Sequence, residues 1–153
     1  MKIKFVNLKK QWNKERKDLL KIIDRTINSG DWVGGKNIQL FEKKISKICN
    51  TKYAVALNSG TDALTLALFS LGVKKGDEVI TAANTFVATV GAITEIGAIP
   101  VFVDCDDTFC MNVNLLEKKI TRKTKAIVPV HFTGYMTDMP KLIKISKKYN
   151  IPV

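Results

Sequence analysis

Four short stretches of almost wholly apolar residues most constrain what this chain can fold into. A strand with one face in water alternates apolar and polar side chains, whereas a strand buried on both faces is apolar throughout. The four stretches are residues 53–57, 78–82, 99–103 and 126–130. Segments with helical periodicity separate them. This order predicts an α/β fold in which a mostly parallel sheet carries helices on both faces.

The helical segments are identified by apolar residues that recur every three or four positions. They are expected at 12–28, 37–49, 61–71, 85–96, 115–120 and 140–149. A further strand is expected to begin within 151–153. Two interpretations are open: a complete five-stranded flavodoxin-like domain, or the N-terminal piece of a longer protein. We favour the second, because a three-residue last strand would leave the preceding helix little to cover.

The composition excludes several classes of protein. With 46% hydrophobic and 25% charged residues, the 153-residue chain is neither disordered nor collagen-like. It has no run of about 18 apolar residues, so we expect no membrane association. Three cysteines and one histidine supply no zinc-type ligand set, so we expect no metal. The same few cysteines fit the reducing cytoplasm, which is the location we expect.

The formal net charge of +11 raises the question of nucleic-acid binding. Of the 25 basic side chains, 22 are lysine, whereas arginine is the usual reader of phosphates and base edges. Paired lysines such as Lys43-Lys44 and Lys147-Lys148 fall on the polar faces of predicted helices. We therefore expect a solvated, lysine-rich surface and no nucleic-acid partner.

The turn between the first apolar stretch and the next helix is suited to binding an anion. Asn58-Ser-Gly-Thr61 follows a predicted strand, and the helix begins at about Thr61. Free amides and the positive end of the helix dipole point at such a turn, and Gly60 lets an anion approach the backbone. The hydroxyls of Ser59 and Thr61 add donors. The alternative is a plain helix cap by Ser59 or Thr61, which is a common role.

Other polar or aromatic residues follow the carboxyl ends of later strands, where α/β sheets bind ligands. Phe86 could lie flat against a planar ligand, or it could pack in the core. His131, the single histidine, could contact a ligand or act as an acid or base; a hydrogen-bonded structural role is equally open. Asp104, Asp106 and Asp107 are interpreted as turn and capping residues.

Taken together and in order, these segments resemble the DegT/DnrJ/EryC1/StrS family of sugar aminotransferases. The similarity runs over nearly all of the chain. The segments that carry it are Phe5-Val-Asn-Leu, Asp31-Trp-Val-Gly-Gly35, Phe41-Glu42, Asn58-Ser-Gly-Thr-Asp-Ala-Leu64, Leu71-Gly-Val-Lys-Lys-Gly-Asp-Glu-Val-Ile80, Asn84-Thr-Phe-Val-Ala-Thr89, Gly97-Ala-Ile-Pro-Val-Phe-Val-Asp104 and Thr124-Lys-Ala-Ile-Val-Pro-Val-His131. No single segment is specific, whereas their common order and spacing are.

The resemblance implies a pyridoxal 5'-phosphate enzyme of the aspartate aminotransferase fold type (fold type I). Such enzymes transfer an amino group, typically from glutamate, to a nucleotide-linked keto sugar in amino-sugar and polysaccharide biosynthesis. By motif match, Gly60 and Thr61 would hold the cofactor phosphate and Phe86 would stack on the pyridine ring. His131 would lie at the edge of the ring, and the loop 31–35 near the sugar nucleotide.

The resemblance also implies that residues 1–153 are the N-terminal part of the large, cofactor-binding domain. The carboxylate that pairs with the pyridinium nitrogen and the Schiff-base lysine would lie beyond residue 153, so no catalytic residue is assigned here. We expect the isolated chain to be inactive and marginally stable, and the full-length protein to be a homodimer. The runner-up is a non-catalytic flavodoxin-like module that binds a phosphorylated ligand.

Overall fold

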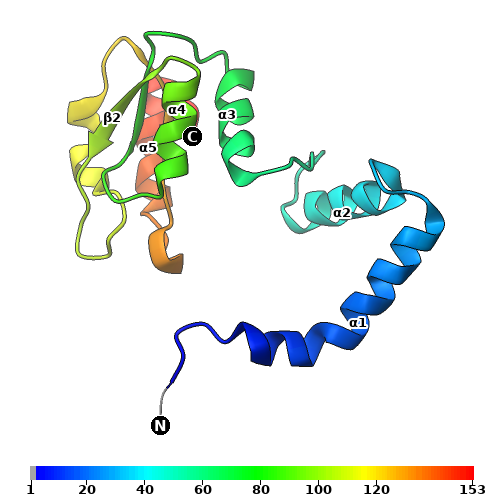
Figure 1. Ribbon diagram of the computed structural model, residues 1–153. Coiled ribbons are helices and arrows are strands. Elements are labelled where there is room, and N and C mark those ends of the chain that lie inside the picture. Colours follow the sequence, from blue (N-terminus) through cyan, green and yellow to red (C-terminus); the bar gives the residue numbers. More distant parts are fainter. Residues whose placement is uncertain (1–2) are drawn as a thin grey trace. The chain divides into compact units, whose positions relative to one another are not determined.

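The computed structural model describes residues 3–153 and divides into two compact units, Met1–Ala56 and Leu57–Val153. The first unit holds two helices, α1 (Leu8–Ser29) and α2 (Gly35–Ile48) (Figure 1). The side-chain oxygen of Asn7 caps α1 by accepting a hydrogen bond from the Lys10 amide at 3.1 Å, which explains why the helix begins earlier than its apolar pattern predicts. Gly30, at a φ of 74°, ends it. No residue of α1 or α2 is buried.

The predicted strand at 53–57 is wrong. This segment has no regular secondary structure, and the side chains of Tyr53 and Val55 are 73% and 75% exposed. A strand is stable only when a neighbour completes its backbone hydrogen bonds, and in the described part of the chain no strand pairs with this segment. Its anchor is instead the Glu42 carboxylate, which accepts a hydrogen bond from the Ala56 amide at 2.8 Å.

The second unit contains a three-stranded parallel sheet in the order β2-β1-β3. The strands are β1 (Glu78–Ala82), β2 (Ile99–Val103) and β3 (Thr124–Val128). The sequence predicts β1 and β2 at these bounds, whereas β3 begins and ends two residues earlier than expected. Pro129 follows β3 directly and has no amide hydrogen with which to extend the ladder.

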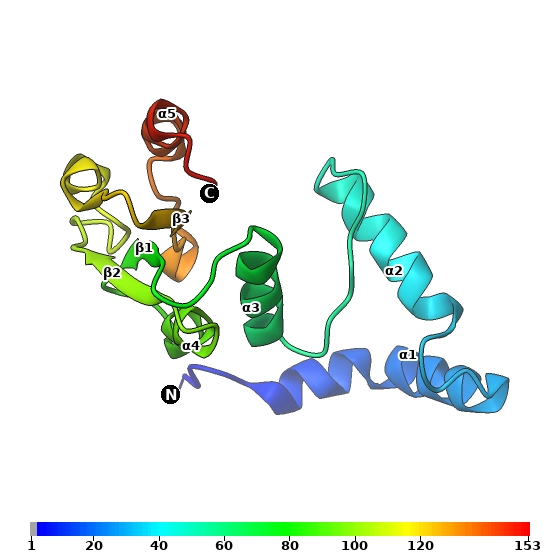
Figure 2. The ribbon, with the colours of Figure 1, turned by 90° about the horizontal axis from the view of Figure 1, so that it is seen from above.

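Helices cover both faces of this sheet, as predicted (Figure 2). They are α3 (Gly60–Ser70), α4 (Val87–Glu95) and α5 (Met139–Tyr149). On one face, Val79 of β1 packs in a cluster with Leu68 of α3 and Ile93 of α4. On the other face, Ile80 of β1 packs in a cluster with Leu142 of α5. The alternation of neighbouring β1 residues between two cores confirms that the strand is buried on both sides.

Two further predictions need correction. The short helix expected at 115–120 consists of two 3₁₀ turns, η1 (Val113–Leu115) and η2 (Glu117–Lys119). Residues 151–153 form no assigned strand, although the Ile127 amide of β3 donates a hydrogen bond to the Pro152 carbonyl at 2.9 Å. This bond places 151–153 along the open edge of β3. A third 3₁₀ turn, η3 (Phe132–Gly134), follows β3.

Apolar surface on the second unit leads to a prediction about the isolated chain. The α3 side chains of Leu66 and Phe69 are 48% and 69% exposed. Another face of α3 lines an apolar groove with β3, formed by Leu64, Ala67, Leu68, Leu71, Ala126, Ile127, Val128, Pro129 and Val153. We expect the isolated 153-residue chain to bind a hydrophobic dye such as ANS and to unfold over a broad temperature range. A sharp, cooperative melt of a soluble monomer without dye binding would contradict this expectation.

Candidate functional site

The carboxyl edge of the sheet brings two of the candidate residues to neighbouring loops. Phe86 follows β1 and immediately precedes α4, and His131 follows β3 and immediately precedes η3. Because β1 and β3 are adjacent and parallel, the loops after them leave the same edge of the sheet. The fold therefore places these two residues where α/β sheets bind their ligands.

The N-terminus of α3 is capped by Ser59. The Ser59 hydroxyl accepts a hydrogen bond from the Asp62 amide at 3.0 Å and donates one to the Asp62 carboxylate at 2.7 Å. The capping role considered from the sequence is thus confirmed for Ser59. Its hydroxyl is engaged within the helix, so the expectation that it adds a donor for an anion is wrong in this conformation.

Gly60 and Thr61, in contrast, present unengaged donors. Among residues 3–153, no acceptor is hydrogen-bonded to the Gly60 amide, the Thr61 amide or the Thr61 hydroxyl. A Cβ atom built on Gly60 would meet no heavy atom within 4 Å, and the residue is exposed. Three donors at the positive end of an 11-residue helix, with open space in front of them, fit a phosphate group.

Phe86 is not a core residue. Its side chain is 71% exposed, although aromatic side chains in the first turn of a helix commonly point inward. Its backbone is held: the carbonyl accepts a hydrogen bond from the Thr89 amide at 3.0 Å, and the Thr85 and Thr89 hydroxyls are hydrogen-bonded at 2.8 Å. The core-packing alternative is therefore wrong, and an aromatic face is available at the carboxyl edge of the sheet.

His131 is exposed but anchored by one ring nitrogen. The Thr137 amide donates a hydrogen bond to Nδ1 at 3.2 Å, and Thr137 itself is only 3% exposed. Nδ1 must then be unprotonated, and the ring proton sits on Nε2. The structural interpretation is confirmed, because the ring has a hydrogen bond to the backbone. A contact of the exposed side chain with a ligand stays a prediction.

Three residues at this edge were missed by sequence reasoning. Thr137 anchors His131, the Asn84 side-chain amide donates to the Phe109 carbonyl at 3.3 Å, and the Thr81 hydroxyl donates to the Val128 carbonyl at 2.9 Å. Thr81 joins β1 to β3 near their carboxyl ends. Asn84 lies in a segment that carries the family resemblance, but its partner, like those of Thr81 and Thr137, is 6 to 47 residues away and cannot be identified from local pattern.

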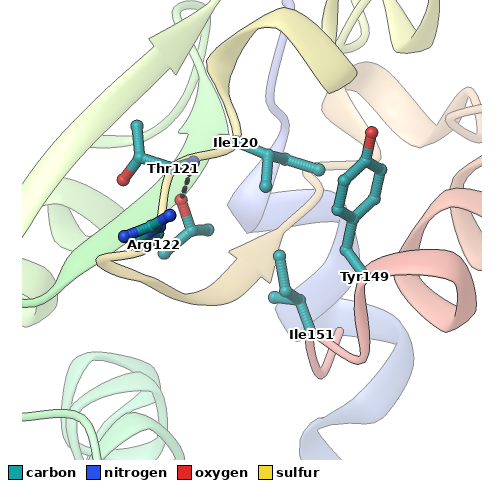
Figure 3. Close-up of a pocket in the computed structure, with 6 residues that line it drawn as sticks. Ile120, Thr121, Arg122, Tyr149 and Ile151 are labelled. Carbon is teal, nitrogen blue, oxygen red and sulfur yellow. Dashed lines mark hydrogen bonds between the residues drawn. The ribbon is translucent and has the colours of Figure 1, made fainter.

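The four candidate cofactor-binding residues all lie in the second unit, but they are not hydrogen-bonded to one another. In the part of the chain that the structure describes, no hydrogen bond links any two of Gly60, Thr61, Phe86 and His131. A separate hollow, drawn in Figure 3, is lined by Ile120, Thr121, Arg122, Thr124, Tyr149 and Ile151. Thr121 to Thr124 lead into β3, so this hollow is at the amino edge of the sheet, opposite to the candidate site.

The acidic segment after β2 folds as a turn. The Asp104 carboxylate accepts a hydrogen bond from the Cys105 amide at 2.8 Å, and the Asp106 carboxylate accepts two from Thr108. The bond from the Thr108 hydroxyl is the main reason that the pKa of Asp106 lies below its usual value. Within 3–153, no group of three or more His, Cys, Asp or Glu side chains could hold a metal ion. The turn-forming interpretation is confirmed for Asp106 and Asp107, because the Asp106 carbonyl accepts a hydrogen bond from the Phe109 amide at 2.9 Å and Asp107 lies within that turn.

The helices between residues 3 and 153 include none with the combined length and apolar character needed to cross a bilayer.

The chain is similar in sequence to several proteins of known activity. The chain is 41% identical over 141 residues to GDP-perosamine synthase of Escherichia coli O157:H7, covering 90% of this chain and 37% of that protein. It is 37% identical over 142 residues to 3-oxo-glucose-6-phosphate:glutamate aminotransferase of Bacillus subtilis (strain 168), covering 92% of this chain and 32% of that protein.

Two solved structures are similar in both fold and sequence. The crystal structure of S. venezuelae DesV superposes with a TM-score of 0.93 at 36% identity, covering 97% of this chain and 40% of that one. The structure of ntda from Bacillus subtilis with bound cofactor PMP gives a TM-score of 0.94 at 36% identity, covering 98% of this chain and 35% of that one. The chain thus spans between 32% and 40% of the length of these proteins.

The DegT/DnrJ/EryC1/StrS aminotransferase family itself matches residues 13–153. This match, together with the two structural similarities, favours the family over the flavodoxin-like alternative. The chain therefore belongs to the DegT/DnrJ/EryC1/StrS aminotransferase family, which depends on pyridoxal phosphate.

Proposed function

We propose that the full-length protein transfers an amino group from glutamate to a nucleotide-linked keto sugar, with pyridoxal phosphate as cofactor. The names of two relatives support the two substrates separately: GDP-perosamine synthase names a nucleotide-linked sugar, and 3-oxo-glucose-6-phosphate:glutamate aminotransferase names glutamate with a keto sugar. The observation that carries the proposal is the set of unengaged donors at the N-terminus of α3, in a chain of a cofactor-dependent family.

Gly60 and Thr61 are proposed to anchor the phosphate of the cofactor. Their two amides and the Thr61 hydroxyl would each donate a hydrogen bond to a phosphate oxygen, and the dipole of α3 would favour the negative charge. Hydrogen bonds to a charged acceptor are the strong ones, each about 1.5–3 kcal/mol. Such an anchor sets the position of the cofactor before any chemistry begins.

Phe86 and His131 are proposed to contact the ring of the cofactor. The exposed Phe86 ring would stack on one face of the planar pyridine, and His131 would lie at its edge. When bound, pyridoxal phosphate supplies the carbonyl group that exchanges with amines and a ring that accepts electrons. The residues of this chain bind and orient that group, and α3, α4 and the sheet hold them in place.

Residues 1–153 are proposed to be the N-terminal part of the cofactor-binding domain, because the chain spans between 32% and 40% of the length of the four proteins compared above. On this proposal the reactive lysine and the carboxylate facing the ring nitrogen lie outside the chain. The proposal extends to a cytoplasmic homodimer. All three cysteines are free thiols, which fits a reducing compartment.

Purification and assay of the full-length protein test this proposal. We expect it to bind pyridoxal phosphate with the absorption band of a protein-bound cofactor, and to convert more than one equivalent of glutamate per cofactor to 2-oxoglutarate only when a keto-sugar nucleotide is present. A panel of GDP-, dTDP- and UDP-linked keto sugars would identify the nucleotide. Absence of cofactor binding, or binding without glutamate turnover on any sugar of the panel, would contradict the proposed activity.

A further inference from the structure

The loop between β3 and α5 is held by contacts to buried groups. The Thr137 hydroxyl donates a hydrogen bond to the Val130 carbonyl at 3.3 Å, and the Thr137 amide donates to Nδ1 of His131 at 3.2 Å. The Cys110 thiol, 1% exposed, donates to the Tyr135 carbonyl at 3.2 Å. The exposed imidazole of His131 is therefore attached to a framework that is itself buried.

The backbone of this loop turns back on itself through η3. Thr133 has a φ of 57°, in the left-handed region that non-glycine residues rarely adopt, and Gly134 follows at 84°. This reversal brings residue 137 back to residue 131. Thr133 in the left-handed region costs conformational energy, whereas Gly134 adopts its positive φ freely, and the hydrogen bonds of Thr137 offset part of the cost at Thr133.

The contact with Thr137 fixes what His131 can do chemically. Nδ1 accepts a hydrogen bond and carries no proton, so Nε2 carries the ring proton and is the donor of this exposed side chain. A proton added to Nδ1 would break the bond to the Thr137 amide. The geometry therefore favours an imidazole that donates one directed hydrogen bond through Nε2.

We propose that His131 is a fixed hydrogen-bond donor, through Nε2–H, to an oxygen at the edge of the cofactor ring, with Thr137 as its positioning residue. This inference rests on the proposed function, because it needs the cofactor at the carboxyl edge of the sheet. The position of His131 after β3, beside the β1 loop that ends at Phe86, supports it. The inference assigns His131 no part in proton transfer.

Two substitutions test the roles of the two imidazole nitrogens separately. In His131→Gln, the side-chain amide nitrogen reaches about as far as Nε2, so the outward donor is kept and the acceptor for Thr137 is lost. In His131→Asn, the side-chain oxygen lies near the position of Nδ1, so the acceptor is kept and the outward donor is too short. Neither side chain takes up a proton near neutral pH.

The experiment measures pyridoxal phosphate affinity, the absorption spectrum of the bound cofactor, turnover and melting temperature for both variants of the full-length protein. We expect His131→Gln to bind the cofactor within about three-fold of wild type, with a slightly lower melting temperature. We expect His131→Asn to bind it about ten-fold more weakly, with a shifted absorption band and an unchanged melting temperature.

Two other outcomes would overturn the inference. If both variants bind the cofactor normally and both lose about 100-fold or more in turnover, His131 transfers protons. If His131→Asn is normal in every respect and only His131→Gln is impaired, the histidine has a structural role alone. Failure of the proposed function is distinguishable from both, because the wild-type protein would then not bind pyridoxal phosphate at all.

Discussion

Substitution of Gly60 by aspartate in the full-length protein should weaken pyridoxal phosphate binding by about 100-fold or more. The new carboxylate would stand beside the proposed phosphate, oppose its charge and displace it from the amides of Gly60 and Thr61, whose charged hydrogen bonds are each worth roughly ten-fold or more in affinity. Cofactor absorbance after gel filtration and a titration with pyridoxal phosphate measure the effect. Cofactor retained at the wild-type level would contradict the phosphate assignment.

We expect this substitution to affect cofactor binding and not folding, because the structure has room for the new side chain. A Cβ atom at Gly60 has open space, and the residue does not need a positive φ. Aspartate at the first position of a helix interacts favourably with the helix dipole, so the melting temperature of the apoprotein should not fall. Gly91 of α4 provides a matched control, because it is also exposed, helical and free of neighbours within 4 Å. Gly91→Asp should retain the cofactor.

The isolated chain of residues 1–153 should show no aminotransferase turnover, even with saturating pyridoxal phosphate. The side chains available to it can hold a phosphate and stack on a ring, whereas the reactive lysine is proposed to lie outside it. A coupled assay for 2-oxoglutarate, with glutamate and the keto-sugar nucleotide that the full-length protein accepts, measures the rate.

The control for this measurement is the full-length protein under the same conditions, with the soluble fraction of the isolated chain quantified. Turnover by the isolated chain above the rate with free pyridoxal phosphate would show that one of its own lysines is reactive. That result would contradict the division of the site proposed here.

The parts of the fold that were predictable from sequence are those determined by local pattern and burial. The strands β1 and β2 are apolar runs between turns; β1 is buried between two layers of helices, whereas β2, at an edge of the sheet, is only partly buried. The first predicted strand failed for a non-local reason: residues 53–57 are as apolar as β2, but a strand also needs a partner. The pattern of apolar residues shows which segments can be buried. Whether such a segment forms a strand depends on whether another strand lies beside it.

In the candidate site, too, the features set by local sequence could be predicted, and those set by distant residues could not. The anion-binding character of Gly60 and Thr61 follows from a local turn and a helix start, which a sequence displays directly. The exposure of Phe86 could not be predicted, because an aromatic residue at a helix start is compatible with core or surface. The tautomer of His131 was also out of reach, since it depends on a backbone amide six residues away that η3 brings back.

A crystal structure of the full-length protein with pyridoxal phosphate bound tests the central claim most directly. We expect the phosphate oxygens to lie about 2.7–3.1 Å from the amide nitrogens of Gly60 and Thr61, at the opening of α3. A phosphate bound at any other part of the molecule, with these two amides turned to solvent, would contradict the account even if the fold were unchanged.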